Sequence, residues 1–397
     1  MLRFTMNAKE LNALLEKAAS VADKSEKNVS TFLTIKTNED EEHKVVILGS
    51  NIIDDHYMRV SSSSARDVMS GEARISVSDI KAMKKMVGDV TVEDTSTDQR
   101  SILSVRNGKK LVNIPKYSND ELVVPDVYSK MPILNVNEAW LFDTVTKLGT
   151  YTDNKGINGI MQVFNFNLKA KRVEALDGHR IGMRALDDHA ITERAVTEGI
   201  TSIMLHNKCV PVFKKVLDKK SNHTVTMYQN DKYVKVEGKD FSYIAKRVEG
   251  QYFKVEQMLT GARSYSFIAD RKKLLDVMKY NYDMGCRGAE RYCSRPVVLH
   301  AKDGKLYSYA QTLKYNLFDE LEAKDVTMDD AFFIGFNPTY LIDAFSIVDV
   351  DGPVCYGTNN NSPLFVEGKE YRFAVLPMIT GDEIIENMKN FVQKVAS

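Results

Sequence analysis

Phe4-Thr-Met-Asn7-Ala-Lys-Glu-Leu11-Asn-Ala-Leu14-Leu15 is the stretch that decides the fold, because its pattern recurs along the chain. Apolar residues alternate before Asn7, as in a strand, and then recur at helical spacing. Asn7 lies between the two patterns, where its side-chain oxygen can accept hydrogen bonds from the first free N–H groups of a helix. The stretch therefore predicts a short strand, a cap and a helix.

The same pattern returns twice, with Asn137 and Asp270 at the cap position. A second series has the predicted caps Ser78, Asn207 and Asn337. Within each series the spacing is roughly 130 residues, and self-similarity at a fixed period indicates a repeated architecture. The six segments predict three copies of one unit, each containing two helices.

Alternating apolar runs lie between the predicted helices, for example Val163-Phe-Asn-Phe166 and Val225-Thr-Met-Tyr228. Such runs are typical of half-buried antiparallel strands, and helices would pack on one face of the sheet. We predict an α+β fold of three similar domains, each with two helices on antiparallel sheet, over residues 1–129, 130–258 and 259–379. Three such domains form an arc, and head-to-tail contact with a second copy can close it into a ring.

The composition limits the function classes. The chain has 397 residues, with 54 Lys+Arg and 54 Asp+Glu, which excludes a protein that is basic all over but not local basic patches. Its four cysteines include no CxxC pair, which predicts reduced thiols and no zinc site. Apolar runs are too short to span a bilayer and the start lacks a signal-peptide pattern, so we expect a cytoplasmic protein. No cofactor or metal is expected.

Five short motifs follow one another along the chain. They are Ile157-Asn-Gly-Ile160, Leu176-Asp-Gly-His-Arg-Ile181, Val248-Glu-Gly-Gln-Tyr-Phe253, Ile334-Gly-Phe-Asn-Pro-Thr-Tyr-Leu341 and Ala374-Val-Leu-Pro-Met378. In this order they resemble motifs of bacterial DNA polymerase III beta subunits, the beta sliding clamps. The resemblance implies a homodimeric ring that encircles double-stranded DNA without sequence specificity and tethers the replicative polymerase. It implies no catalysis.

The resemblance also implies an apolar cleft for short hydrophobic peptides from the DNA polymerase III alpha subunit, the clamp loader and other proteins with a clamp-binding motif. Flexible Met with Leu and Ile can line an adaptable groove. Phe253 stands where the family often has Pro, and Leu176 where a small polar residue is common, which predicts a reshaped cleft. The positions carried over are Ile157, Leu176, Gly178, His179, Ile181, Phe253, Met258, Leu376, Pro377 and Met378.

Candidate DNA contacts are mostly basic residues, because Lys and Arg contact phosphates, which carry no sequence information. They lie on the predicted helices 76–88, 206–220 and 270–282, in the first interhelix loop, and in a loop at 151–155 that corresponds to a DNA-contacting loop of the family. The alternative is an ordinary solvated helix face. The candidates are Lys24, Lys27, Lys81, Lys84, Lys85, Tyr151, Asn154, Lys155, Lys208, Lys214, Lys215, Arg271 and Lys272.

The subunit contact is expected where a strand of the first domain meets the third domain, because unpaired strand edges seek partners. We expect Leu111 and Ile114 on one side of this contact and Tyr280 and Met284 on the other.

The chain continues beyond the last motif, whereas chains of the family usually end near it. Residues 380–397 carry apolar residues at helical spacing, including Ile384 and Met388, and predict an amphipathic helix. One hypothesis is that this helix packs near the cleft and limits access to it. The alternative is that it packs elsewhere on the third domain.

Two other functions stay open at this point. One is a clamp-like scaffold that binds protein partners without encircling DNA. The other is a hydrolase that uses Asp177 and His179, although the sequence has no HExxH or GxSxG motif. It also has no P-loop motif, so ATP hydrolysis for ring opening would have to come from another protein.

Overall fold

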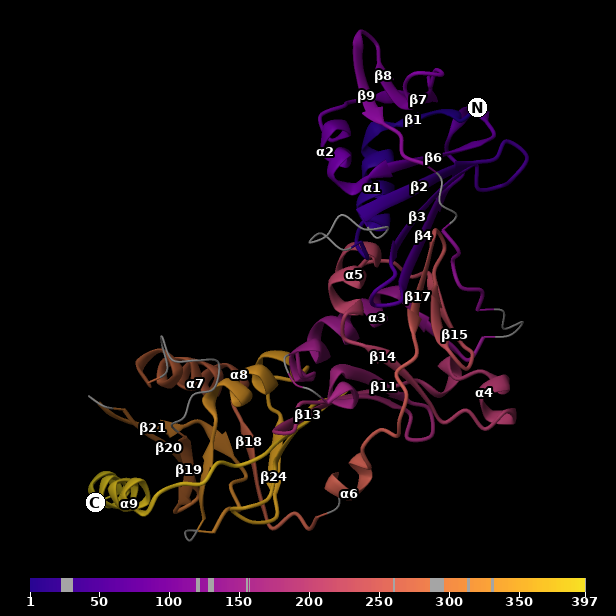
Figure 1. The fold of residues 1–397 in the computed structure, drawn as a ribbon. Helices are drawn as coiled ribbons and strands as arrows, with labels where there is room; N and C mark the ends of the chain where they lie inside the picture. The colour runs from indigo at the N-terminus through magenta and orange to yellow at the C-terminus, as the bar shows by residue number, and fades with distance from the viewer. Residues whose placement is uncertain are drawn as a thin grey trace. The chain divides into compact units, whose positions relative to one another are not determined.

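The computed structural model describes residues 1–22, 31–118, 122–127, 132–154, 156, 158–259, 261–285, 296–312, 315–329 and 332–396. They form two compact units (Figure 1). Unit 1 contains residues 1–146 and 187–249, and unit 2 contains residues 147–186 and 250–397. This division passes through the second predicted repeat, so the domain limits 1–129, 130–258, 259–379 and 380–397 stay predictions.

Unit 1 contains two antiparallel sheets and the helices that cover them. Its elements are β1 (Arg3–Asn7), α1 (Ala8–Ala18), β2 (Phe32–Thr37), β3 (Val45–Asn51), β4 (His56–Ser62), β5 (Arg66–Met69), β6 (Gly71–Ser76), a 3-10 turn (Val77–Asp79), α2 (Ile80–Met83), β7 (Asp89–Asp94), β8 (Ile102–Asn107), β9 (Lys110–Pro115), β10 (Leu134–Asn137), α3 (Glu138–Leu148), α4 (Glu193–Thr197), β14 (Ser202–His206), α5 (Cys209–Val216), β15 (Thr224–Gln229), β16 (Tyr233–Glu237) and β17 (Phe241–Lys246). The five-stranded sheet has the order β5-β1-β7-β8-β9, and the eight-stranded sheet has the order β10-β15-β16-β17-β4-β3-β2-β6. α1 packs on β3 and β4.

Unit 2 is also built from antiparallel strands and helices. Its elements are β11 (Val163–Asn167), β12 (Arg172–Leu176), β13 (Arg180–Ala185), α6 (Val255–Leu259), β18 (Tyr265–Ala269), α7 (Arg271–Gly285), β19 (Val297–Lys302), β20 (Lys305–Gln311), β21 (Asn316–Leu321), β22 (Ala323–Lys324), β23 (Phe333–Phe336), α8 (Pro338–Ile347), β24 (Val354–Gly357), β25 (Leu364–Glu367), β26 (Tyr371–Val375) and α9 (Asp382–Ala396). Within unit 2, the strands of one sheet follow the order β11-β12-β13-β26-β25-β24-β18-β22, and a four-stranded sheet runs β21-β20-β19-β23. α7 and α8 pack on each other.

The six predicted strand–cap–helix segments are all present, with four of the predicted caps. The side-chain oxygens of Asn7, Asn137, Asp270 and Asn337 each accept a hydrogen bond from a backbone N–H in the first turn of the following helix. These bonds satisfy donors that a helix leaves free at its start. The repeat pattern in the sequence therefore identified the helix starts correctly at these positions.

The other two predicted caps are wrong. Ser76 caps in place of Ser78, because its Oγ accepts from the N–H of Ser78 at 3.2 Å. His206 Nδ1 accepts from the N–H of Lys208 at 3.1 Å, one residue before Asn207. The regular helices that follow are short, Ile80–Met83 and Cys209–Val216, so they cover less of the chain than the predicted ranges 76–88 and 206–220.

The five-stranded sheet of unit 1 has one apolar and one polar face. Phe4, Val92 and Val105 are buried on the apolar face. Arg3 and Glu93 lie on the opposite face and form an exposed ion pair at 3.7 Å. This alternation is what a sheet shows when only one face is covered.

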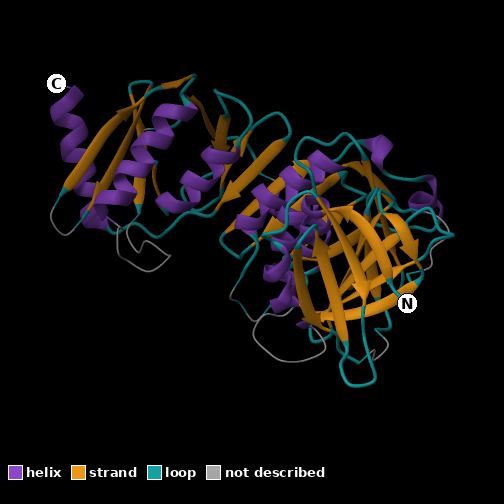
Figure 2. Ribbon diagram, turned by 90° about the horizontal axis from the view of Figure 1, so that it is seen from above, coloured by secondary structure: helices purple, strands orange, loops and turns teal. Residues whose placement is uncertain are grey.

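The four-stranded sheet of unit 2 is covered on both faces. Tyr307 and Tyr309 pack with Met388 and Val392 of α9. α7 contacts β20 and β21 as well, and Figure 2 shows the helix that ends at the C-terminus on one side of these strands and other helices on the opposite side. Residues Leu306–Ala310 of β20 are accordingly all buried, without alternation.

Candidate functional site

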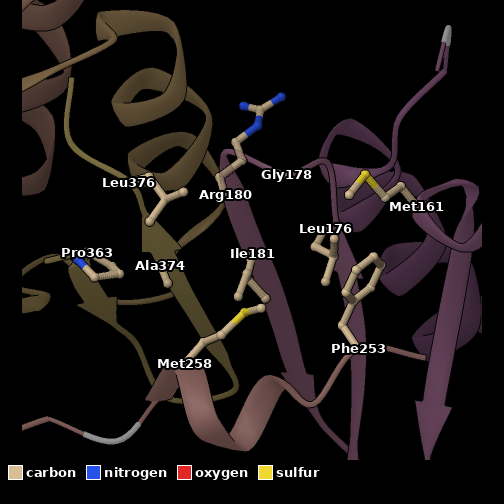
Figure 3. Close-up of a pocket in the computed structure, with 10 residues that line it drawn as sticks. All are labelled: Met161, Leu176, Gly178, Arg180, Ile181, Phe253, Met258, Pro363, Ala374 and Leu376. Carbon is tan, nitrogen blue, oxygen red and sulfur yellow. The ribbon is translucent and has the colours of Figure 1, made fainter. Parts of the chain in front are cut away.

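An apolar pocket of about 440 Å³ lies in unit 2, where β12, β13, β26 and α6 approach one another (Figure 3). Six of its lining residues were predicted from the motifs. The lining consists of Met161, Leu176, Gly178, Arg180, Ile181, Phe253, Met258, Pro363, Ala374 and Leu376. The pocket is therefore made by segments that are far apart in the sequence and carry mostly aliphatic, aromatic and thioether side chains.

Strand pairing positions the floor of the pocket. Ile181 on β13 lies opposite Leu176 on β12 and opposite Ala374 on β26. These residues belong to one buried cluster with Val255 of α6, and Phe253 packs against that cluster. The floor is thus fixed by two hydrogen-bonded strand pairs and by the core beneath them.

The turn between β12 and β13 explains the Asp-Gly-His-Arg motif. Asp177 Oδ1 accepts hydrogen bonds from the N–H groups of His179 and Arg180, both at 3.1 Å. Gly178 has φ +87°, a left-handed conformation that glycine adopts without a steric penalty. The carboxylate and the glycine together hold the turn at the rim of the pocket.

Arg180 is held by polar and aromatic groups outside the apolar pocket. Its Nε donates to Asp177 at 2.9 Å, its Nη2 donates to the carbonyl of Thr150 at 2.7 Å, and its Nη1 donates to Asp343. The guanidinium also lies over the rings of Tyr151 and Tyr340, at 4.9 and 4.4 Å.

Burial opposes the charge of Arg180, but Tyr151, Asp177 and Asp343 raise its pKa above the ordinary value. Figure 3 shows the guanidinium pointing away from the other lining side chains. The charge therefore fixes the turn, and the pocket interior stays apolar.

Three predicted cleft residues do not line the pocket. The ring of His179 stacks on that of Tyr340, with centroids 5.9 Å apart. Met378 donates its backbone N–H to the carbonyl of Gly335 at 2.8 Å, at the edge of β23. Pro377 lies between this bridge and Leu376. A fourth predicted residue, Ile157, lies outside the described residues.

Four lining residues were not predicted. Arg180 belongs to a motif that was quoted for its neighbours. Ala374 was identifiable, because it lies two residues before Leu376 and alternate residues of a strand share a face. Met161 and Pro363 come from segments that carry no site signal of their own.

The C-terminal helix is present as predicted, but the hypothesis that it limits access to the pocket is wrong. None of its residues lines the pocket. Met388 and Val392 are buried on the four-stranded sheet, and the ring of Phe391 stacks on that of Phe318 at 4.7 Å. The apolar stripe is used to cover a sheet face, which was the alternative interpretation.

The groups proposed for hydrolysis are occupied by local structure. Both carboxylate oxygens of Asp177 are hydrogen-bonded within the turn or to Arg180. Over the described part of the chain, no group of three or more His, Cys, Asp or Glu side chains is arranged to hold a metal ion. Burial raises the pKa of the Cys209 and Cys355 thiols.

Among the residues that the structure describes, no helix is both long and apolar enough to cross a membrane.

The whole chain can be compared with solved structures. A DNA polymerase III beta chain from Streptococcus pneumoniae is 15% identical, with a TM-score of 0.83 over 96% of this chain and 100% of that one. A DNA polymerase sliding clamp from Bacillus subtilis is 16% identical, with a TM-score of 0.83 and the same coverage. One from Pseudomonas aeruginosa is 17% identical, with a TM-score of 0.81 over 96% and 100%. The fold is that of the three-domain bacterial beta clamp.

Two comparisons of the sequence itself found no match. No protein-family model matches it, and no curated protein matches it. The α+β clamp fold, with antiparallel sheets and helices, was predicted from the repeat and from short motifs. The comparison confirms that prediction over nearly the full length of the chain.

The clamp fold leaves most of the predicted DNA contacts exposed. Lys81, Lys85, Lys214, Lys215 and Lys272 are exposed on or beside α2, α5 and α7.

Other predicted contacts are partly engaged within the fold. Lys84 pairs with Glu16, and Lys208 pairs with Asp54. Arg271 is half-buried and donates to the carbonyl of Phe345 at 3.3 Å.

One predicted DNA contact is wrong. Tyr151 has no exposed surface, because its ring lies beneath Arg180 and stacks on Phe373 at 5.1 Å. Asn154 in the same loop is exposed. Lys24, Lys27 and Lys155 lie outside the described residues.

The predicted subunit-contact residues divide in the same way. Leu111, Tyr280 and Met284 are 50%, 52% and 36% exposed. Ile114 is only 1% exposed, so its side chain belongs to the core of unit 1, and the contact through its strand stays a prediction. Leu111 and Ile114 are three positions apart on β9, so their side chains point to opposite faces of the sheet.

Proposed function

We propose that the protein is a DNA sliding clamp, a head-to-tail homodimeric ring that encircles duplex DNA and tethers a DNA polymerase. The observation that carries the proposal is the apolar pocket of unit 2. Six residues that the motifs assign to a peptide cleft line it, in a chain with the beta-clamp fold. The function is mechanical, because a closed ring cannot leave the duplex sideways and phosphate contacts without sequence preference allow it to slide.

The pocket chemistry selects apolar partners. Ile181, Phe253 and Leu376 offer no hydrogen-bonding side-chain groups, and the charge of Arg180 is already paired with Asp177 and Asp343. Burial of two or three apolar side chains at about 25 cal/mol per Å², less the cost of ordering a peptide, corresponds to roughly micromolar affinity. A short hydrophobic segment of a polymerase or a clamp loader has this chemistry.

Exposed lysines on or beside α2, α5 and α7 would contact the phosphates. Lys81, Lys214, Lys215 and Lys272 all present their side chains to solvent. Their interactions would be screened by salt, so the affinity for DNA should fall steeply as the salt concentration rises. The acidic residues elsewhere that balance their charge would keep the outer surface from binding DNA.

The free strand edges support the ring. Among the described residues, β9 is hydrogen-bonded to β8 alone and β21 to β20 alone. The β8–β9 hairpin carries Arg106 and Lys110, and β21 carries Asp319 and Glu320. Edges of opposite charge would pair between two copies, which gives a head-to-tail contact.

Retention on circular DNA tests the proposal. The protein is loaded onto nicked circular DNA by a clamp loader, and the complex is isolated by gel filtration before and after the circle is cut. A ring stays on circles and runs off linear DNA, whereas a scaffold that does not encircle DNA shows no dependence on cutting. Equal retention on both forms, or none on either with a loader that acts on other clamps, contradicts the proposal.

Peptide binding tests the pocket separately. Leu376→Ala should weaken the binding of a fluorescent clamp-binding peptide by about tenfold, because it removes part of the pocket wall. The matched control is Ile379→Ala in the same segment, since Ile379 is 98% exposed and does not line the pocket. Equal effects of the two variants would contradict the assignment of the pocket.

A further inference from the structure

An exposed leucine lies on the outer face of the five-stranded sheet, near the tip of the β8–β9 hairpin. Leu111 is 50% exposed on β9 and lies opposite Arg106 of β8. The next outward pair along these strands is Asn113 with Ser104. An exposed leucine at the edge of a polar face has no role in the core of unit 1, because the buried side chains of β9 and β8, such as Ile114 and Leu103, point to the other face.

A second apolar surface lies at the edge of the four-stranded sheet. Phe391 of α9 is 39% exposed although it stacks on Phe318 of β21. Phe318 lies opposite Tyr309, and Glu320 lies opposite Tyr307, so these four side chains share the face that α9 covers. α9 therefore does not end over the middle of the sheet but extends its apolar surface to the free edge strand.

The two surfaces lie on corresponding sides of their sheets. In the five-stranded sheet, Leu111 is on the face opposite the buried core residues. In the four-stranded sheet, Phe318 and α9 are on the face opposite α7. When β9 of one copy is added to β21 of another with the core faces on the same side, Leu111 comes to the side that carries Phe391.

We propose that α9 is part of the subunit contact: Leu111 of one copy packs on Phe391 and Phe318 of the second copy. The inference rests on the proposed ring and adds to the pairing of strand edges an apolar contact that the C-terminal helix supplies. Arg106, which lies beside Leu111, would face Glu320, which lies beside Phe318 on β21. Glu320 is also paired with Lys305 at 3.1 Å, so the apolar contact is the larger contribution.

A double-mutant cycle on the full chain tests this contact. Leu111→Ala and Phe391→Ala should each raise the dimer dissociation constant about tenfold in sedimentation equilibrium, as truncation of a central interface side chain does. Because each change removes the same contact, the double variant should be weakened much less than a hundredfold. Gln393→Ala, an exposed polar position on the same helix, is the control and should leave dimerisation unchanged.

A conservative variant separates packing from folding of the helix. Phe391→Met keeps an apolar side chain of similar length and should retain most of the dimer affinity, while the circular dichroism of all variants stays that of the wild type. Independent effects of Leu111→Ala and Phe391→Ala, or an unchanged dissociation constant for Phe391→Ala, would overturn the proposal while leaving the ring intact. A wild-type chain that stays monomeric at high concentration would instead overturn the proposed ring itself.

Discussion

The five-stranded sheet of unit 1 and the four-stranded sheet of unit 2 differ in what covers their outer faces. The first has a polar outer face with the Arg3–Glu93 ion pair. The second has an apolar outer face with Tyr307 and Tyr309, over which α9 lies. The difference shows that the sequence of the four-stranded sheet is adapted to α9, because Tyr307 and Tyr309 would be exposed to water without this helix.

The largest expected effect comes from truncation of the covering helix. Met388→Ala should lower the free energy of unfolding by about 3 kcal/mol, because Met388 is fully buried between α9 and β20. The matched change on the uncovered sheet is Arg3→Ala, which should cost no more than about 0.5 kcal/mol, as exposed ion pairs contribute little. Urea unfolding followed by circular dichroism compares the two. Similar costs would show that α9 is only loosely held.

A second change acts on the segment that leads to α9. A Cβ atom at Gly335 would lie 2.3 Å from Thr380 Oγ1 and 3.3 Å from the carbonyl of Met378. Gly335→Ala should therefore displace this segment, cost about 2 kcal/mol and speed hydrogen exchange at the N–H of Met378. Gly381→Ala is the control, because a Cβ there meets nothing within 4 Å. Unchanged exchange in Gly335→Ala would contradict the close contact.

A third change, at Asp94 of the five-stranded sheet, tests how the stability of the protein depends on pH. Desolvation favours protonation of Asp94 on β7, but hydrogen bonds from Lys116 and Ser96 outweigh it and lower its pKa. A lowered folded-state pKa stabilises the protein above the unfolded value and loses this contribution as the pH falls through the folded value. Asp94→Asn should cost about 1 kcal/mol at neutral pH and progressively less below about pH 4, measured by urea unfolding. A cost that does not depend on pH would refute the charged interaction.

The smallest expected effect has the opposite sign. Desolvation raises the pKa of Asp319 on β21, so its charged form opposes folding at neutral pH and this cost disappears as the pH falls through the raised value. Asp319→Asn should raise the free energy of unfolding by up to about 0.5 kcal/mol at neutral pH and by less in acid. Destabilisation at neutral pH would mean that the carboxylate has a favourable partner, such as a second copy of the chain.

Much of the fold could be predicted from the sequence, because the deciding signals are local. Caps such as Asn7 and Asn337 precede helical spacing directly, and the stripe of α9 is visible in its own residues. The alternation of side chains along a strand also assigns the Ile114 side chain to the core, once Leu111 is placed on the outer face.

The rest depends on contacts between distant segments. Tyr151 ends a 3-10 turn whose sequence is compatible with exposure, and its ring is covered by Arg180 and Phe373, which lie far away in the sequence. Pro363 enters the pocket through a loop that precedes β25, which no local pattern connects to Ile181. Such residues are placed by tertiary packing, which secondary-structure propensity and hydrophobic periodicity do not reveal.

The position of α9 in the chain has a consequence for biosynthesis. All four strands that it covers are made before it, so a nascent chain exposes Tyr307, Tyr309 and Phe318 until the last turns of α9 have emerged. During that interval the sheet is open to aggregation and to chaperones. Translation that stops before Met388 would leave this apolar surface permanently exposed, and chaperones or proteases that bind exposed apolar surface would recognise such truncated products.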